Sequence, residues 1–321
     1  MPKKLAVIVV VAILAMLAVG CNGVGGTADP IDLIPSDANV IAYLDLSTAM
    51  ENEELLEQFF MPTDPESGQM VEDVLEIFEG LTEAWLFFDL SDTATGPGYG
   101  GVIVKGDFDE SELIDQIIVV VEEELEAVDY EGHEILTAED GAEALAVLGG
   151  DSFVIGTLES VKDVISVMEG DKDAIGGKVL STFNSLSKAD LRMAMEVPPG
   201  TMDDLLGEGT GGMGFELPGL ESLADLDTIG LTLDDRGNTA ALDVKMCFTS
   251  QESAEAVDEL VDTLLVFVEM AAGESPELEE LLNSIEKSVS GSCLTISIEI
   301  SEAQFESIME GFGGVSSGMG F

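Results

Sequence analysis

Histidine, the side chain used most often as a catalytic base, occurs once in this chain. His133 is the single histidine among 321 residues. A Ser–His–Asp arrangement would have to use it as the base, and the sequence nominates no serine to accompany it. The run Tyr130-Glu131-Gly132-His133 indicates a glycine-containing turn that enters a strand. We therefore interpret His133 as an exposed, structural histidine.

Carboxylates are abundant, but their spacing does not predict a site. Asp107-Phe-Asp109-Glu-Ser111 supplies the first three alternating oxygens of a calcium loop, yet it lacks the glycine of the sixth position, and Ile118 replaces the glutamate of the twelfth. Asp109 or Ser111 as the cap of a following helix explains the same residues. Paired carboxylates for glycoside hydrolysis cannot be identified without spatial distances. We predict no catalytic residue, no metal ligand and no cofactor.

The N-terminal residues predict export. Lys3 and Lys4 precede an apolar run at 5–20, and this order is typical of a secretory signal. The run is shorter than the roughly 20 residues of a spanning helix. Ala18-Val19-Gly20-Cys21 resembles a lipobox, the motif at which bacterial and archaeal lipoproteins are cut and lipidated. The resemblance implies that Cys21 carries lipid and anchors an extracytoplasmic protein to the cell membrane; an uncleaved N-terminal anchor, or a signal cut at another site, is the alternative.

Cys247 and Cys293 are the two cysteines that remain. An even pair in an oxidising compartment predicts a disulfide. A zinc site is not favoured, because no histidine or further cysteine lies near them in the sequence. If the strands that carry them are neighbours, the closed loop stabilises the fold by roughly 3–4 kcal/mol in the chain-entropy model.

The charge balance excludes one class of partner. The chain carries 65 Asp and Glu against 11 Lys and Arg, a formal net charge of −54. Nucleic acid and anionic lipid surfaces are repelled by such a surface. A salt-rich habitat would screen the self-repulsion, whereas specific binding of cations such as Ca²⁺ would use carboxylate oxygens. Scarce Lys and Arg and evenly spread acidity favour the salt-rich, halophilic type of surface.

Hydrophobic periodicity predicts strands and helices throughout the chain. We expect strands at 39–46, 84–90, 101–108, 133–137, 144–148, 152–157, 191–197 and 226–234. We expect helices at 47–60, 70–80, 109–128, 160–169 and 252–269. The last helix has an apolar face made of Val257, Leu260, Val261, Leu264, Leu265 and Val268. Hairpins between the strands imply antiparallel pairing.

Short motifs recur in the same order at a nearly constant spacing. The run 104–108 returns at 244–248, and 166–170 returns at 307–311. Weaker matches join 36–38 with 187–189, 81–89 with 226–234, and 150–152 with 291–293. Such repetition predicts an internal duplication, against the alternative of chance similarity between two ordinary α+β patterns. In this alignment Asp107 and Ser152 take the places of Cys247 and Cys293, so the first copy lacks the bridge.

These patterns predict an α+β fold of two tandem duplicated units, each an antiparallel sheet with helices packed on one face. The expected segments are a lipoprotein signal peptide at 1–21, a flexible spacer at 22–30, a first unit at 31–177, a second unit at 178–312 and a Gly-rich tail at 313–321.

Several motifs carry a family resemblance. Pro35-Ser-Asp-Ala38 and Tyr43-Leu-Asp-Leu46, with the runs 130–135 and 148–156, resemble an uncharacterised family of secreted and lipid-anchored prokaryotic proteins that is known only as a domain of unknown function. These are turn and strand motifs. The resemblance therefore implies fold and location and brings no catalytic residues.

We expect a lipid-anchored extracytoplasmic binding or scaffold protein without catalytic activity. Its expected partners are the membrane, through lipid on Cys21, and a cell-surface protein or cations. The alternative is a solute-binding lipoprotein that holds a small ligand or cation between its two units, although such receptors usually have parallel βαβ lobes. A hydrolase with carboxylate chemistry is the least favoured hypothesis, and a buried acidic pair would be needed to support it.

Overall fold

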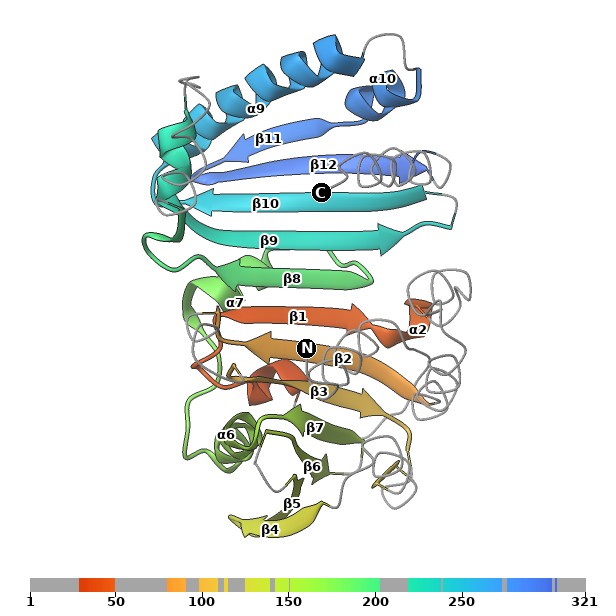
Figure 1. Cartoon of the computed structure of the whole chain (residues 1–321), viewed down its shortest axis with the longest axis vertical. Helices are drawn as coiled ribbons and strands as arrows, with labels where there is room; N and C mark the ends of the chain where they lie inside the picture. The colour runs from red at the N-terminus through yellow and green to blue at the C-terminus, as the bar shows by residue number, and fades with distance from the viewer. Residues whose placement is uncertain are drawn as a thin grey trace, which may run out of the picture. The chain divides into compact units, whose positions relative to one another are not determined.

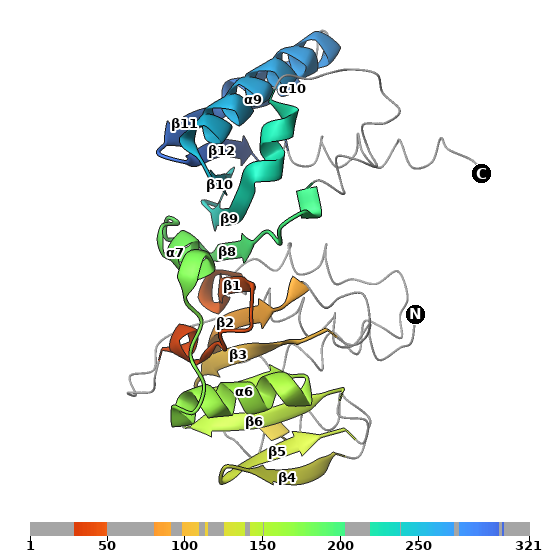
Figure 2. The ribbon, with the colours of Figure 1, turned by 90° about the vertical axis from the view of Figure 1, so that its left-hand side faces the viewer.

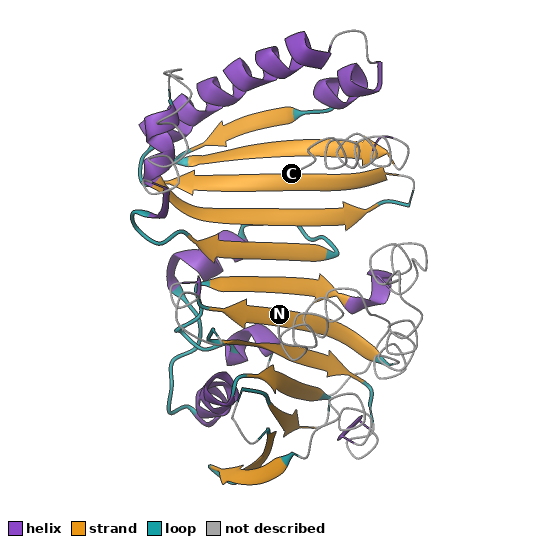
Figure 3. Cartoon of the chain, in the orientation of Figure 1, coloured by secondary structure: helices purple, strands orange, loops and turns teal. Residues whose placement is uncertain are grey.

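The computed structural model describes residues 29–49, 80–90, 98–108, 113–114, 125–138, 142–149, 151–202, 219–237, 239–272, 276–301 and 304. The chain divides into two compact units, Met1–Ser181 (unit 1) and Thr182–Phe321 (unit 2). Each unit combines antiparallel strands with helices (Figures 1 and 3). The predicted mixture of helices with antiparallel sheet is thus confirmed.

Unit 1 contains an antiparallel sheet with the strand order β1-β2-β3-β7-β6-β5-β4. Its strands are β1 (Val40–Asp45), β2 (Leu81–Phe88), β3 (Gly100–Gly106), β4 (Glu126–Tyr130), β5 (His133–Thr137), β6 (Ala144–Gly149) and β7 (Ser152–Gly156). The central strands bury apolar side chains on both faces, as the continuous apolar runs of the sequence require.

Helix α6 (Leu158–Glu169) packs on this sheet along its length (Figure 2). Thr157 caps its start by accepting a hydrogen bond from the Ser160 amide, and Gly170 ends it in a left-handed conformation that favours glycine (φ 83°). Val161, Val164 and Ile165 recur at helical spacing and are fully buried. The helix therefore covers one face of the β6–β7 region.

The N-terminal part of unit 1 is joined by backbone contacts to the segment that follows α6. A short 3₁₀ helix, η1 (Pro30–Leu33), precedes β1, and a helical turn, α2 (Leu46–Ala49), follows it. Pro35 forms an isolated antiparallel bridge with Ala174, and the Ile175 amide donates to the Ile34 carbonyl at 2.7 Å.

Unit 2 contains an antiparallel sheet with the strand order β11-β12-β10-β9-β8. Its strands are β8 (Leu191–Glu196), β9 (Leu226–Asp235), β10 (Thr239–Phe248), β11 (Glu286–Ser290) and β12 (Cys293–Ser301). Its helices are the 3₁₀ helix η3 (Leu220–Asp225), α9 (Gln251–Ala272) and α10 (Pro276–Asn283). Helix α7 (Gly177–Asn184) ends inside this unit.

Helical residues cover both faces of the unit 2 sheet, so the expectation of helices on one face is wrong here. Ala254 and Val257 of α9 pack in one cluster with Phe248, Leu294 and their neighbours. On the opposite face, Thr182 of α7 hydrogen-bonds Thr228 at 2.8 Å. Successive side chains of a strand point to opposite faces. In β9, Thr228 is buried on the side of α7, and Ile229 is partly buried against the cluster that contains α9.

Helix α9 is buried only in its first half, which corrects the predicted apolar face. Val257 and Leu260 are buried, at 2% and 3% exposed. Leu264 and Val268 lie on the same predicted face but are each 41% exposed. The helix extends past the part of the sheet that can cover it, and helical periodicity carries no information about that limit.

Two further predictions need correction or fall outside the described residues. The helix expected at 109–128 cannot reach residue 128, because β4 begins at Glu126 and pairs with β5. Most of the helices expected at 47–60 and 70–80, and the tail at 313–321, lie outside the described residues.

Candidate functional site

The predicted disulfide provides the centre of a candidate site in unit 2. Cys247 and Cys293 form a bond with an S–S distance of 2.11 Å and a Cα–Cα distance of 4.0 Å. They are directly paired residues of β10 and β12. The Phe248 amide donates to the Ser292 carbonyl at 2.9 Å, so the next pair along the ladder is hydrogen-bonded and the cysteine pair is not. Side chains of non-hydrogen-bonded pairs approach most closely, which explains why these strands can carry the bridge.

The disulfide lies on the polar face of the sheet. Alternation along β10 places Lys245 on the same face as Cys247, and Met246 and Phe248 on the apolar face. Both cysteines are partly exposed, whereas Leu294, next to Cys293, is fully buried. The two cysteines are therefore partly exposed on the face that lies away from the apolar core.

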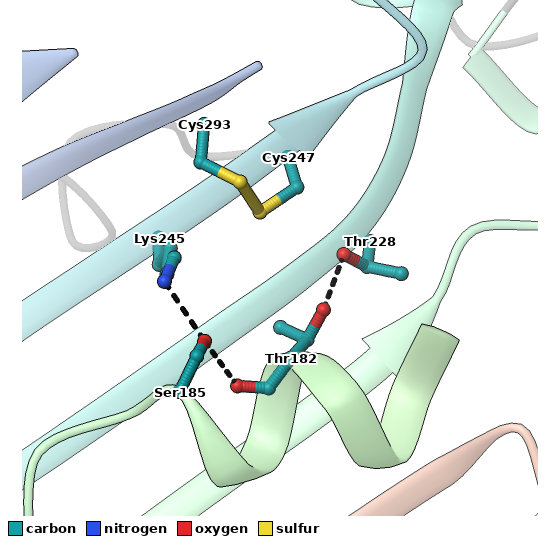
Figure 4. Close-up of a disulfide and its surroundings, with 6 residues drawn as sticks. All are labelled: Thr182, Ser185, Thr228, Lys245, Cys247 and Cys293. Atoms are coloured by element: carbon teal, nitrogen blue, oxygen red, sulfur yellow. Dashed lines mark hydrogen bonds between the residues drawn. A yellow bond between two sulfur atoms is a disulfide. The ribbon is translucent and has the colours of Figure 1, made fainter. Parts of the chain in front are cut away.

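A chain of hydrogen bonds borders the disulfide (Figure 4). Lys245 Nζ donates to Ser185 Oγ at 2.8 Å, and Ser185 Oγ donates to the Thr182 carbonyl at 2.6 Å. The Thr182 hydroxyl bonds that of Thr228 at 2.8 Å, and Thr228 is the partner of Cys247 on β9. The bridge thus lies beside a lysine whose ammonium group is held in place by the segment after α7.

The segment after α7 approaches the sheet closely at Gly230. A Cβ atom added there would lie 2.6 Å from Leu186 Cδ2. Glycine therefore allows Leu186 to contact the strand, which keeps Thr182 and Ser185 close to the polar face. Sequence reasoning missed Lys245, Ser185, Thr182 and Thr228, and their separation along the chain offers no motif that could have identified them.

The corresponding strand pair of unit 1 has no cysteine. Ser152 of β7 pairs with Lys105 of β3, so the residue that takes the place of Cys247 in the sheet is Lys105 and not Asp107, to which the sequence alignment matches it. Strand β3 ends at Gly106, and Asp107 instead bonds the Gly80 carbonyl through its amide at 2.9 Å. Short sequence motifs predict the order of the strands but not their exact pairing. An error of two residues in the register leaves every side chain on the same face, so the hydrophobic pattern of the sequence does not reveal it.

His133 lies at the start of β5, where the sequence predicts it. Its Nε2 atom lies 3.0 Å from Glu169 Oε1 at the end of α6. In the same hairpin, Tyr130 bonds Ser166 at 2.9 Å, and Lys162 Nζ lies 5.5 Å from the centre of the Tyr130 ring. These contacts attach the β4–β5 hairpin to α6, which is a structural role.

A lysine between two aspartates occurs in each unit. In unit 1, Lys172 Nζ lies 2.5 Å from Asp37 and 2.6 Å from Asp163, which joins the start of the unit to α6. In unit 2, Lys287 Nζ of β11 lies 2.7 Å from both Asp258 and Asp262 of α9. Both lysines link a helix to another part of their unit.

The pKa shifts of these groups follow from their surroundings. Burial lowers the pKa of Lys172, but the hydrogen bonds that its ammonium group donates to Asp163 and Asp37 outweigh it, so the net pKa is raised. The pKa of Lys287 is raised in the same way by Asp258 and Asp262 against the effect of burial. Burial raises the pKa of the Tyr99 phenol well above its ordinary value, and the charge of Asp163 adds to it. Tyr99 therefore stays protonated and donates to Asp163 at 3.0 Å.

The described residues contain no group of three or more His, Cys, Asp or Glu side chains arranged to hold a metal ion. Of the weak calcium motif, Asp107 is described, while 109–112 are outside the described part of the chain, as is the lipidation residue Cys21. No described helix is both long and apolar enough to cross a membrane.

Comparisons with known proteins identify a shared fold and no family. No family model matches the chain, and none of the curated proteins matches it. Among solved structures, crystal forms I, III and IV of TP0453 are similar, with TM-scores of 0.51, 0.51 and 0.52 and identities of 13%, 14% and 14%. Each match covers 88% of this chain and 97–98% of the other. At this identity the likeness shows a common fold alone.

Proposed function

We propose that this chain is a lipid-anchored, extracytoplasmic binding or scaffold protein that catalyses no reaction. One observation carries the non-catalytic part. The single histidine, His133, is held by Glu169, and Lys172 and Lys287 are each held between two aspartates, so these groups serve contacts between neighbouring elements. The lipid anchor rests on the resemblance of Ala18-Val19-Gly20-Cys21 to a lipobox.

The anchor is tested by fractionating cells that express the full chain with Cys21→Ala. We expect the variant to leave the membrane fraction or to accumulate with an uncut signal, and the wild-type N-terminal peptide to carry a lipid mass on Cys21. Cys247→Ala is the matched control, because it removes a cysteine that is not in the lipobox. Equal membrane association of wild type and Cys21→Ala, without lipid on the wild-type peptide, contradicts the anchor.

The binding role is tested by crosslinking on intact cells followed by native mass spectrometry of the purified protein. A reproducible protein partner or a retained small molecule or cation supports it. Turnover of a substrate by the purified chain, lost in a point variant, contradicts the proposal that the chain is not an enzyme.

We also propose that the two units arose by duplication. The strand orders β1-β2-β3-β7-β6 and β8-β9-β10-β12-β11 correspond one to one. Two of the pairing registers correspond too, whereas that of β3 with β7 differs from the sequence match by two residues. Sequence matching relates Val40 to Leu191 and Phe88 to Leu233; Val40 pairs with Phe88, and Leu191 pairs with Leu233. It also relates Gly149–Ser152 to Ser290–Cys293, and both are observed pairs. Solved structures of diverged homologues that keep both registers would support common descent, and homologues with only one unit-like register would weigh against it.

We further propose that the acidic surface is adapted to salt. With a net charge of −54, screening should stabilise the fold. Thermal unfolding in rising NaCl, compared with CaCl₂ at equal ionic strength, distinguishes the two explanations. Equal midpoints at equal ionic strength support general screening, and an excess midpoint in CaCl₂ indicates specific cation binding.

A further inference from the structure

The Cys247–Cys293 bond joins strands that are already paired. Nine residue pairs connect β10 with β12, from Thr239–Ser301 to Cys247–Cys293, and the Phe248 amide extends the ladder to Ser292. The bond sits at the end of this ladder and closes a separation of 46 residues. Cleavage of the bond leaves every one of these backbone pairings possible.

Unit 1 provides an internal comparison. Its β3–β7 pair holds Lys105 opposite Ser152, and Lys105 Nζ lies 4.0 Å from Asp151 Oδ2. The same kind of strand pair therefore forms without a covalent link. This observation suggests that the disulfide of unit 2 is an addition to the sheet and not a condition for building it.

The surroundings of the sulfurs suit exchange with a thiol. Both cysteines are partly exposed and lie on the polar face, away from the core around Phe248 and Leu294. Lys245 lies on that face two residues before Cys247 (Figure 4), and its ammonium group donates a hydrogen bond to Ser185. A neighbouring cation stabilises the thiolate that leaves when a disulfide is attacked, and a more stable leaving thiolate speeds the exchange.

We propose that the Cys247–Cys293 disulfide is a thiol-exchange site that is reduced in the folded protein, so that β10 and β12 change from a covalent to a purely hydrogen-bonded connection. An incoming thiolate attacks one Sγ atom, the S–S bond breaks, and the other sulfur leaves as a thiolate beside Lys245. A second thiol attacks the mixed disulfide. The two thiols become one disulfide, and their two protons and two electrons end on Cys247 and Cys293.

The experiment treats the native full chain with reduced glutathione or, in parallel, with a reduced protein dithiol of the thioredoxin type. Free thiols are trapped with a maleimide and located by peptide mass spectrometry, which reads Cys21 separately. We expect labelling of both Cys247 and Cys293 without denaturant, by one or both reagents. The arm that reacts identifies whether a small thiol or a protein dithiol has access. If neither reagent gives labelling until a denaturant is added, the site is a closed structural bridge and the proposal is wrong.

Two variants distinguish thiol exchange assisted by Lys245 from a general loss of stability. Lys245→Gln keeps a hydrogen-bond donor but removes the charge, so the exchange rate should fall severalfold. Lys105→Gln, at the related strand pair of unit 1, should leave the rate unchanged. Equal rates for both variants overturn the role of Lys245. A second measurement compares the oxidised protein with the reduced protein, or with the double variant Cys247→Ser and Cys293→Ser. Amide hydrogen exchange should become faster at the end of the β10–β12 ladder that holds the cysteines, while amides paired between β9 and β10 stay protected. Loss of protection throughout unit 2 would contradict an exchange site that works in the folded protein.

Discussion

Units 1 and 2 arrange strands in the same succession but secure them differently. Among the largest fully buried side chains of the described residues, all but Phe183 and Leu294 belong to unit 1. The covering helix α6 is buried along its inner face, whereas α9 is buried only in its first half. Unit 2 adds a disulfide that unit 1 lacks. The unit whose covering helix leaves its second half exposed is thus the unit that carries the covalent link.

The largest effect should come from removing that link. For a separation of 46 residues, the chain-entropy model predicts that Cys247→Ser with Cys293→Ser lowers the free energy of unfolding by about 4 kcal/mol. Urea denaturation followed by far-ultraviolet circular dichroism measures the loss. Hydrogen exchange should locate it in β10 and β12, with β2 and β3 protected as before.

The matched control is Lys105→Ser, which places two serines at the related pair of unit 1. Only a partly exposed ion pair with Asp151 is lost, so the cost should stay below about 1 kcal/mol. Equal costs for the two changes would show that the covalent bond does not distinguish the units.

A second prediction concerns the two halves of α9. Val257 is 2% exposed and Val266 is 54% exposed. Val257→Ala should cost about 2 kcal/mol, because it removes buried methyl groups and leaves a cavity in the cluster with Phe248. Val266→Ala makes the same chemical change on an exposed surface and should stay within about 0.5 kcal/mol. Chemical denaturation of both variants measures the difference, and a large cost for Val266→Ala would mean that the second half of α9 is covered in solution.

The sequence predicts the strands of each unit better than it predicts how the helices pack on them. The strand at 133–137 agrees with β5, and those at 191–197 and 226–234 agree closely with β8 and β9, because alternation and turn residues are local signals. The exposure of Leu264 and the position of α7 on the second face of unit 2 depend on contacts between distant segments, and no local pattern encodes them.

The candidate site likewise has a part that the sequence predicts and a part that depends on contacts between distant segments. Cysteine parity and compartment predict Cys247 with Cys293, and two strands that pair in register provide the geometry. The role of Lys245 depends on Ser185, which lies 60 residues away along the chain. Lys105, two residues before Asp107 in the sequence, is the residue that pairs with Ser152. Only the strand register shows this.

The smallest predicted effects concern the two lysines that each form ion pairs with two aspartates. Lys172 and Lys287 side chains are 24% and 15% exposed, so Lys172→Met and Lys287→Met should each cost about 1 kcal/mol. Each tie should weaken at high salt, because screening reduces the attraction between the ammonium group and its two aspartates. Thermal or urea unfolding at low and high NaCl measures this, and a cost that is unchanged by salt would argue against an electrostatic tie.

Alkaline pH should lower the stability of the two units to different extents, because they contain different groups with raised pKa values. A raised pKa means that the folded state holds its proton more tightly, so this stability is complete below the ordinary pKa and is lost as pH rises through the folded value. Unit 1 has two such groups, Lys172 with an ordinary pKa of 10.5 and Tyr99 with one of 10.0. Unit 2 has Lys287 and the exposed Arg236, and the arginine keeps its proton throughout this pH range. Unit 1 should therefore lose more stability as pH rises above 10.0. Trp85, the single tryptophan and a buried residue of β2, reports unit 1 by fluorescence. Tyr99→Phe should flatten the decline of its thermal midpoint above that pH, because phenylalanine cannot release a proton from the unfolded chain; an identical decline in the variant would remove Tyr99 from the comparison.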